Sequence, residues 1–92
     1  MKHFAVFLPM KDANKSQDFR SAHLAFLEEL RTNGKVAANG KFADCTGGLV
    51  VYKAQSFEEC ETLVKMDPYV AQGARNYEIY EWEVVWADES HI

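Results

Sequence analysis

Six segments of differing periodicity follow one another along the chain, and their order constrains the fold more than any other feature. Segments rich in β-branched and aromatic residues, typical of strands, cover residues 3–8, 35–44, 49–54 and 76–86. Two segments between them repeat apolar side chains at helical spacing, over residues 16–32 and 57–66. The order β-α-β-β-α-β predicts an α+β fold of the ferredoxin-like type, with a four-stranded antiparallel sheet and both helices on one face.

Capping signals mark the ends of the two expected helices. Asn14 or Ser16 is the expected N-cap of the first helix. Asn33-Gly34 is its stop, because glycine readily takes the left-handed conformation that closes a last turn. Ser56 followed by Glu59 three residues later predicts a capping box at the start of the second helix.

Glycines punctuate the strands between the helices. Asn39-Gly40 interrupts the second strand and predicts a bulge or a close backbone approach. Thr46-Gly47-Gly48 predicts the turn into the third strand. Residues 70–75 fit neither a helix nor a strand pattern.

The length bounds the domain organisation. A chain of 92 residues has room for one hydrophobic core. We therefore expect a single domain over residues 1–87 and a polar tail at 88–92 that frays. The apolar run at residues 4–8 is too short for a membrane span or a signal-peptide core, so we expect a cytoplasmic protein without a membrane partner.

Composition argues against several function classes. The formal net charge is -4, and the ten basic residues are scattered, so a nucleic-acid partner is not expected. Cys45 and Cys60 are expected to be reduced thiols that pack as small buried side chains. No CxxC or His-x-His spacing favours a metal, and no nucleotide or flavin motif is present, so we expect no cofactor.

The last strand has apolar side chains on both of its faces. One face carries Tyr80, Trp82, Val84 and Trp86, and the other carries Tyr77, Ile79 and Val85. A sheet with one solvated face should alternate apolar and polar residues more cleanly. Exposed, such a surface would exceed the apolar patch usual for a monomer. We therefore predict a homodimer in which two sheets pack face to face.

His23 interrupts the apolar stripe of the first helix, between Phe19 and Phe26, and should point at the sheet. It is either a core histidine whose ring nitrogens are satisfied locally or a general acid or base, since imidazole titrates near neutral pH.

Asp67-Pro68-Tyr69 follows the second helix. Asp67 either caps the N–H groups of a local turn or takes part in proton transfer with His23. The predicted fold does not by itself bring these two side chains together. Tyr69 either packs or lines a pocket.

Other ionisable residues are weaker candidates for a functional site. Arg20 is either a solvated surface residue or, if it faces the same cavity as His23, an anchor for an anionic group. Glu81 and Glu83 lie two apart in the last strand and share a face, as a solvent-facing rim or a pair of carboxylates. His3 and His91 lie near the ends of the chain, and the sequence indicates no partner for either.

The sequence resembles the YciI-like (YCII-related) proteins over nearly its whole length. The matching positions are Arg20-x-x-His23-Leu24, Gly34, Gly40, Asp44, Gly47-Gly48, Ser56, Asp67-Pro68-Tyr69 and Gly73. The resemblance implies a dimeric α+β barrel, with His23 and Asp67 as the suspected catalytic residues. Arg20, Gly40 and Tyr69 are then expected at the substrate pocket. One departure is Lys41, where the family usually has proline after the glycine.

These observations favour a small enzyme that needs only proton transfer. His23 and Asp67 would form an acid–base pair for an isomerisation or elimination on a small organic metabolite. Two alternatives stay open: a non-enzymatic module that binds a small molecule or a partner on the dimer, and a cofactor-independent monooxygenase. Relatives of the same barrel carry different chemistries, so the fold leaves the reaction open.

Overall fold

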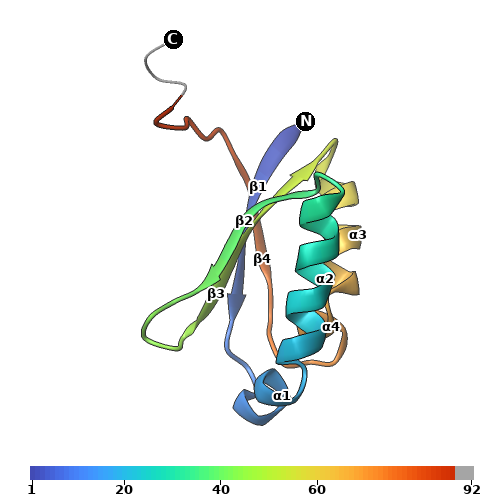
Figure 1. The fold of residues 1–92 in the computed structure, drawn as a ribbon, viewed down its shortest axis with the longest axis vertical. Coiled ribbons are helices and arrows are strands. Elements are labelled where there is room, and N and C mark those ends of the chain that lie inside the picture. Colours follow the sequence, from blue (N-terminus) through green and yellow to red (C-terminus); the bar gives the residue numbers. More distant parts are fainter. Residues whose placement is uncertain (89–92) are drawn as a thin grey trace.

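The computed structural model describes residues 1–88 and contains a four-stranded antiparallel sheet with its helices on one face (Figure 1). The elements, in chain order, are β1 (Lys2–Pro9), α1 (Ala13–Asp18), α2 (Arg20–Thr32), β2 (Val36–Lys41), β3 (Gly47–Ala54), α3 (Phe57–Met66), α4 (Pro68–Ala71) and β4 (Glu78–Trp82). The strand order is β2-β3-β1-β4. The predicted α+β fold class is confirmed.

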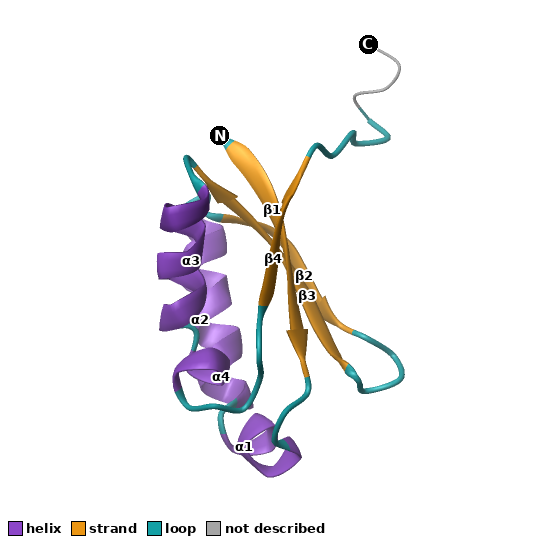
Figure 2. Ribbon diagram, turned by 180° about the vertical axis from the view of Figure 1, so that it is seen from behind, coloured by secondary structure: helices purple, strands orange, loops and turns teal. Residues whose placement is uncertain are grey.

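The central strand β1 defines the two faces of the sheet. It pairs with β3 over its whole length, from Lys2↔Ala54 to Pro9↔Gly47, and with β4 on its other edge. Alternate residues of β1 and β3 are fully buried beneath α2 and α3, where they form the core with Leu27, Cys60 and Val64. Seen from behind, α2 and α3 again lie on the same side of the sheet (Figure 2). The helices leave the opposite face of the sheet uncovered.

The first predicted helix is two helices. Residue 19 interrupts it: Phe19 has φ -101° and ψ 8° and ends α1 before α2 begins at Arg20. The N-cap of α1 is Asp12, whose carboxylate accepts from the Lys15 amide at 3.0 Å, and the prediction of Asn14 or Ser16 was wrong. Aspartate at this position satisfies an amide that the first helical turn leaves unpaired.

The other caps agree better with the sequence. Gly34 has φ +75°, and the amides of Gly34 and Lys35 donate to Arg31 and Leu30, which is the Schellman closure of α2. Ser56 accepts from the Glu59 amide at 3.1 Å. The Glu59 carboxylate accepts from Lys35 Nζ at 3.5 Å, so only half of the capping box is present.

The hairpin between β2 and β3 differs from its prediction. The bulge lies between Val36 and Ala38, before the Asn39-Gly40 pair. Gly47 and Gly48 belong to β3, and the turn spans residues 42–46. Gly47 pairs with Pro9, and a Cβ at Gly47 would lie 2.5 Å from the Leu8 carbonyl, so a glycine is needed for this close approach.

The C-terminal third is less regular than expected. The strand predicted over residues 76–86 is only Glu78–Trp82. The ambiguous residues 70–75 include the end of α4, which begins at Pro68. Phe57, the first apolar residue of the helical segment 57–66, is 44% exposed. The domain limits of 1–87 and 88–92 stay a prediction, and residues 89–92 of the expected tail lie outside the described part.

Candidate active site

The fold brings His23 and Asp67 into direct contact. His23 lies in the first turn of α2, and Asp67 lies at the junction between α3 and α4. Nδ1 of His23 lies 2.8 Å from Oδ1 and 2.9 Å from Oδ2 of Asp67. The Asp67 side chain is fully buried, and 8% of His23 is exposed. The two residues form a buried pair that joins α2 to the α3–α4 junction.

Asp67 also acts as a local helix cap. Its Oδ1 accepts from the Tyr69 amide at 2.9 Å, and Pro68 occupies the first position of α4, where a missing N–H costs nothing. This cap holds the carboxylate at the helix end that faces His23. The two readings of Asp67 therefore describe one geometry, in which the cap orients the group that binds the imidazole.

The geometry determines which ring nitrogen of His23 carries the proton. An ionised carboxylate can only accept hydrogen bonds, so Nδ1 is the donor to Asp67. In the neutral imidazole Nε2 then has a free lone pair. His23 is among the residues that line the cavity described below. In this tautomer the ring can accept a proton at Nε2, and the Asp67 carboxylate lies where it would stabilise the resulting imidazolium.

Tyr69 and Arg75 hold the ring from one side. The Tyr69 ring stacks on the imidazole, with centroids 3.9 Å apart and planes at 14°. The Arg75 guanidinium lies over the other face of Tyr69, 4.5 Å from its centroid. Arg75 also donates to Ser16 Oγ at 2.9 Å and to the Leu8 carbonyl at 3.1 Å. This layered contact limits rotation of the His23 ring.

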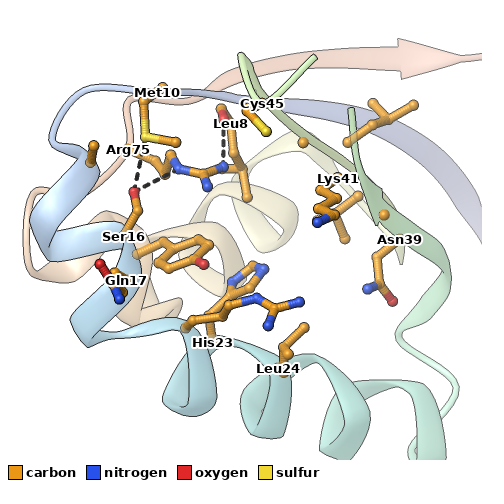
Figure 3. Close-up of a pocket in the computed structure, with 18 residues that line it drawn as sticks. Leu8, Met10, Ser16, Gln17, His23, Leu24, Asn39, Lys41, Cys45 and Arg75 are labelled. Atoms are coloured by element: carbon orange, nitrogen blue, oxygen red, sulfur yellow. Dashed lines mark hydrogen bonds between the residues drawn. The ribbon is translucent and has the colours of Figure 1, made fainter. Parts of the chain in front are cut away.

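A cavity of about 420 Å³ adjoins the imidazole, between the α1–α2 region and the β2–β3 hairpin (Figure 3). Its lining includes each of the three expected substrate-binding residues, Arg20, Gly40 and Tyr69. Arg20 is the first residue of α2, one turn before His23. Gly40 pairs with Leu49 in the sheet and has no side chain, so it contributes only backbone atoms to the cavity wall. A pocket of this size accommodates a small organic molecule.

The two cysteines differ in burial. Cys60 is fully buried, as predicted, and burial raises the pKa of its thiol to about 12. Cys45 was expected to be buried but is exposed, because it occupies the turn of the β2–β3 hairpin with φ +65°. It lies at the margin of the cavity.

The remaining candidates lie away from the imidazole. Oε1 of Glu81 lies 3.6 Å from Nζ of Lys2 in an ion pair. The rings of His3 and Trp86 pack edge to face, with their centroids 5.8 Å apart. Glu83 follows the end of β4, and His91 lies outside the described residues. Within residues 1–88, no three His, Cys, Asp or Glu side chains are placed to hold a metal ion.

Two residues near the pair were missed by the sequence reasoning. Arg75 precedes β4 in irregular chain, where no motif distinguishes it from a surface arginine. Tyr52 is a core residue of β3 whose hydroxyl has no partner among residues 1–88. Burial and the charge of Asp67 both raise the pKa of Tyr52. Its apolar strand gave no sign that a hydroxyl would be buried near this carboxylate.

Comparison with known proteins agrees with this architecture. The chain is 33% identical over 79 residues to the uncharacterized protein YjpA of Bacillus subtilis, which covers 86% of this chain and 93% of the relative. It is similar in structure to 5-chloro-2-hydroxyhydroquinone dehydrochlorinase of Burkholderia phenoliruptrix, solved in complex with 2,5-dihydroxybenzoquinone. That likeness has a TM-score of 0.75 at 24% identity over 88% of this chain and 93% of that one, and it shows the fold.

In the described part of the chain, no helix is both long enough and apolar enough to cross a bilayer. The model of the YCII-related domain matches residues 1–83, which is nearly all of the described sequence. The chain therefore belongs to the YCII-related family.

Proposed function

We propose that this protein is a small enzyme that uses His23 and Asp67 for acid–base chemistry on a small organic molecule. The observation that supports this most is the hydrogen bond from Nδ1 of His23 to the buried Asp67 carboxylate, beside a cavity that the same ring lines. A histidine that only fills the core has no need of an adjoining cavity. The pair can move a proton without help from another group.

The proposed reaction is an isomerisation or an elimination. Nε2 of His23 takes a proton from a carbon next to a carbonyl, and the C–H electron pair moves onto the carbonyl oxygen as an enolate. The imidazolium then returns the proton to another carbon, which is an isomerisation. Alternatively, the electron pair returns to carbon and expels an anion from the neighbouring carbon, which is an elimination. A positioned acid–base group contributes about 10²- to 10⁴-fold to such a step.

The structural relative named as a dehydrochlorinase is consistent with the elimination, because loss of hydrogen chloride is a reaction of that class. Its name supplies a probe substrate. We expect chloride release from 5-chloro-2-hydroxyhydroquinone, or deuterium exchange from solvent into an enolisable ring ketone, to depend on His23.

The matched test compares His23→Asn with His3→Asn, since His3 is a second imidazole on the opposite face of the sheet. His23→Asn should lower turnover by at least about 100-fold while the circular dichroism spectrum is retained. His3→Asn should leave turnover unchanged. Equal activity of wild type and His23→Asn, or no turnover by the wild type with either probe, would refute the proposed chemistry.

We also propose that a second copy of the chain covers the bare face of the sheet. Phe7, Tyr80 and Trp82 lie on this face and are 38%, 53% and 42% exposed. The Phe7 ring contacts both Tyr80 and Phe42, which makes the aromatic surface continuous. Monomeric proteins rarely expose such a patch.

The oligomeric state tests this proposal directly. Sedimentation equilibrium at micromolar concentration should give twice the chain mass for the wild type. Trp82→Glu should give the chain mass, because it places a charge on the proposed interface. A monomeric wild type would show that the face is not used in this way.

A further inference from the structure

The cavity beside His23 is lined by positive charge in a protein that is acidic overall. Arg20, Lys41 and Arg75 all line it, and no Asp or Glu among residues 1–88 does. The whole chain has 14 acidic and 10 basic residues, so a random surface would carry more acid than base. Asp67 is nearby but fully buried behind the imidazole. The cavity therefore concentrates cations with no acidic side chain to neutralise them.

Two of the three cations have no partner in the described chain. Arg75 is engaged, because it donates to Ser16 and Leu8 and stacks on Tyr69. The side chains of Arg20 and Lys41 make no hydrogen bond or ion pair with any residue in 1–88. Both are exposed, so solvent or a bound ligand is left to satisfy them.

The two free cations come from opposite walls of the cavity. Arg20 lies at the start of α2, one turn before His23. Lys41 ends β2 and pairs with Gly48, which pairs in turn with Leu8, so it lies on the helix-covered face of the sheet. In Figure 3, Lys41 and Asn39 on the hairpin face His23 and Leu24 on α2 across the cavity. A ligand beside the imidazole would have a cation on each side.

Asn39 adds a hydrogen-bond donor to the same wall. The Arg31 guanidinium, which can only donate, binds Oδ1 of Asn39. The amide oxygen is thereby occupied, and the NH2 group is what Asn39 has left to offer the cavity that it lines. Charged and neutral donors on one wall match a ligand whose exposed atoms are acceptors.

We propose that the substrate of this site is an organic anion, bearing carboxylate or acidic enol oxygens, and that Lys41 together with Arg20 determines this specificity. The inference rests on the function proposed above, because the same molecule would present its C–H group to Nε2 of His23. It adds the substrate class and a second task for the cations. They stabilise the enolate oxygen on which negative charge develops when His23 takes the proton.

Calorimetric titration with two anions and their neutral counterparts tests the proposal. Maleate represents carboxylates and maleamide is its neutral analogue, while 2,5-dihydroxybenzoquinone represents acidic enols and its dimethyl ether is neutral. The variants are Lys41→Met, Arg20→Met, the double variant and Lys41→Arg. Lys65→Met is the matched control, since Lys65 lies on the exposed side of α3 outside the cavity.

The wild type should bind at least one anion more tightly than its neutral counterpart, and the preferred anion identifies the oxygen chemistry. Each single Met variant should weaken that anion about 10-fold, and the double variant about 100-fold, because a hydrogen bond to a charged group is lost each time. Lys41→Arg and Lys65→Met should bind as the wild type does. Added salt should weaken binding of the anion alone.

Three results would overturn the inference: unchanged affinity in the double variant, equal binding of the neutral counterparts, or no binding of either anion by the wild type at millimolar concentration. A parallel titration of His23→Asn separates this inference from the proposed function. If that variant loses turnover but keeps anion affinity, the acid–base role stands whatever the Lys41 and Arg20 variants show.

Discussion

Replacing Asp67 separates its two tasks, because asparagine caps a helix as well as aspartate does but carries no charge. In Asp67→Asn the amide oxygen can keep the hydrogen bond from the Tyr69 amide. The NH2 group then lies where Oδ2 now stands, 2.9 Å from Nδ1 of His23. The amide oxygen also stays 2.8 Å from Nδ1 and can still accept from it, but the side chain no longer carries the negative charge that stabilises an imidazolium. Nε2 at the cavity would then accept a proton with no carboxylate to stabilise the imidazolium.

Asp67→Asn and Asp67→Ala should therefore differ in stability and agree in activity. Asp67→Asn should change the free energy of unfolding by less than about 1 kcal/mol, since the cap is kept. Asp67→Ala loses a cap and leaves a buried ring N–H unpaired, which together should cost about 2 to 5 kcal/mol. Both variants should lower turnover by about 10²- to 10⁴-fold. Urea denaturation followed by circular dichroism measures the first quantity, and initial rates measure the second.

Asp12 is the matched control, because its carboxylate also caps a helix, accepting from the amide three residues on where Asp67 accepts from the amide two residues on, and it does not contact His23. Asp12→Ala should lose about 0.5 to 2 kcal/mol and Asp12→Asn almost nothing, with turnover unchanged in both. If Asp67→Asn is as active as the wild type, the carboxylate serves only as a cap. If it is as unstable as Asp67→Ala, the argument that the retained cap preserves stability is wrong.

Three further predictions concern the surroundings of the pair. In the native protein, Cys45 alone should react with a disulfide reagent at pH 8, because a pKa of about 12 leaves the buried Cys60 thiol protonated. Both thiols should react in urea. Reaction of Cys60 in the native state would contradict its burial. Tyr52→Phe should leave the free energy of unfolding unchanged or raise it by about 1 kcal/mol, because it removes a buried hydroxyl that has no partner among residues 1–88. A clear decrease of this free energy in urea denaturation would show that the hydroxyl has a partner, such as a bound water. Tyr69→Phe should keep both the stack on the imidazole and the free energy of unfolding. Tyr69→Ala should lower the free energy of unfolding by about 3 to 5 kcal/mol. Similar urea unfolding curves for these two variants would show that the stack contributes little.

The fold was predictable because each element carries its own local signal. The β-branched and aromatic residues of segment 49–54 identified β3, and Ser56 and Gly34 marked helix ends through side-chain and backbone conformations that act within a few residues. The failures occurred where tertiary packing decides. Phe19 breaks the first helix without a proline or glycine to announce it, and the bulge at Val36 follows from pairing with β3.

The site was predictable only in part. His23 stood out because a titratable ring interrupted an apolar stripe, and Asp67 because aspartate before proline begins a turn. Their contact spans 44 positions of sequence and depends on how α2 packs beside α4, which no local pattern encodes. Arg75 acts through Tyr69, so its place in the site follows from the same packing.

The protonation state of the His23 ring tests the central claim most directly. Long-range ¹H–¹⁵N correlation spectra of the wild type, assigned by comparison with His23→Asn, report which ring nitrogen carries the proton at neutral charge. The structure predicts a protonated Nδ1 and a bare Nε2. A wild-type ring that carries its proton on Nε2 would contradict the role of Asp67 as acceptor and remove the base from the cavity.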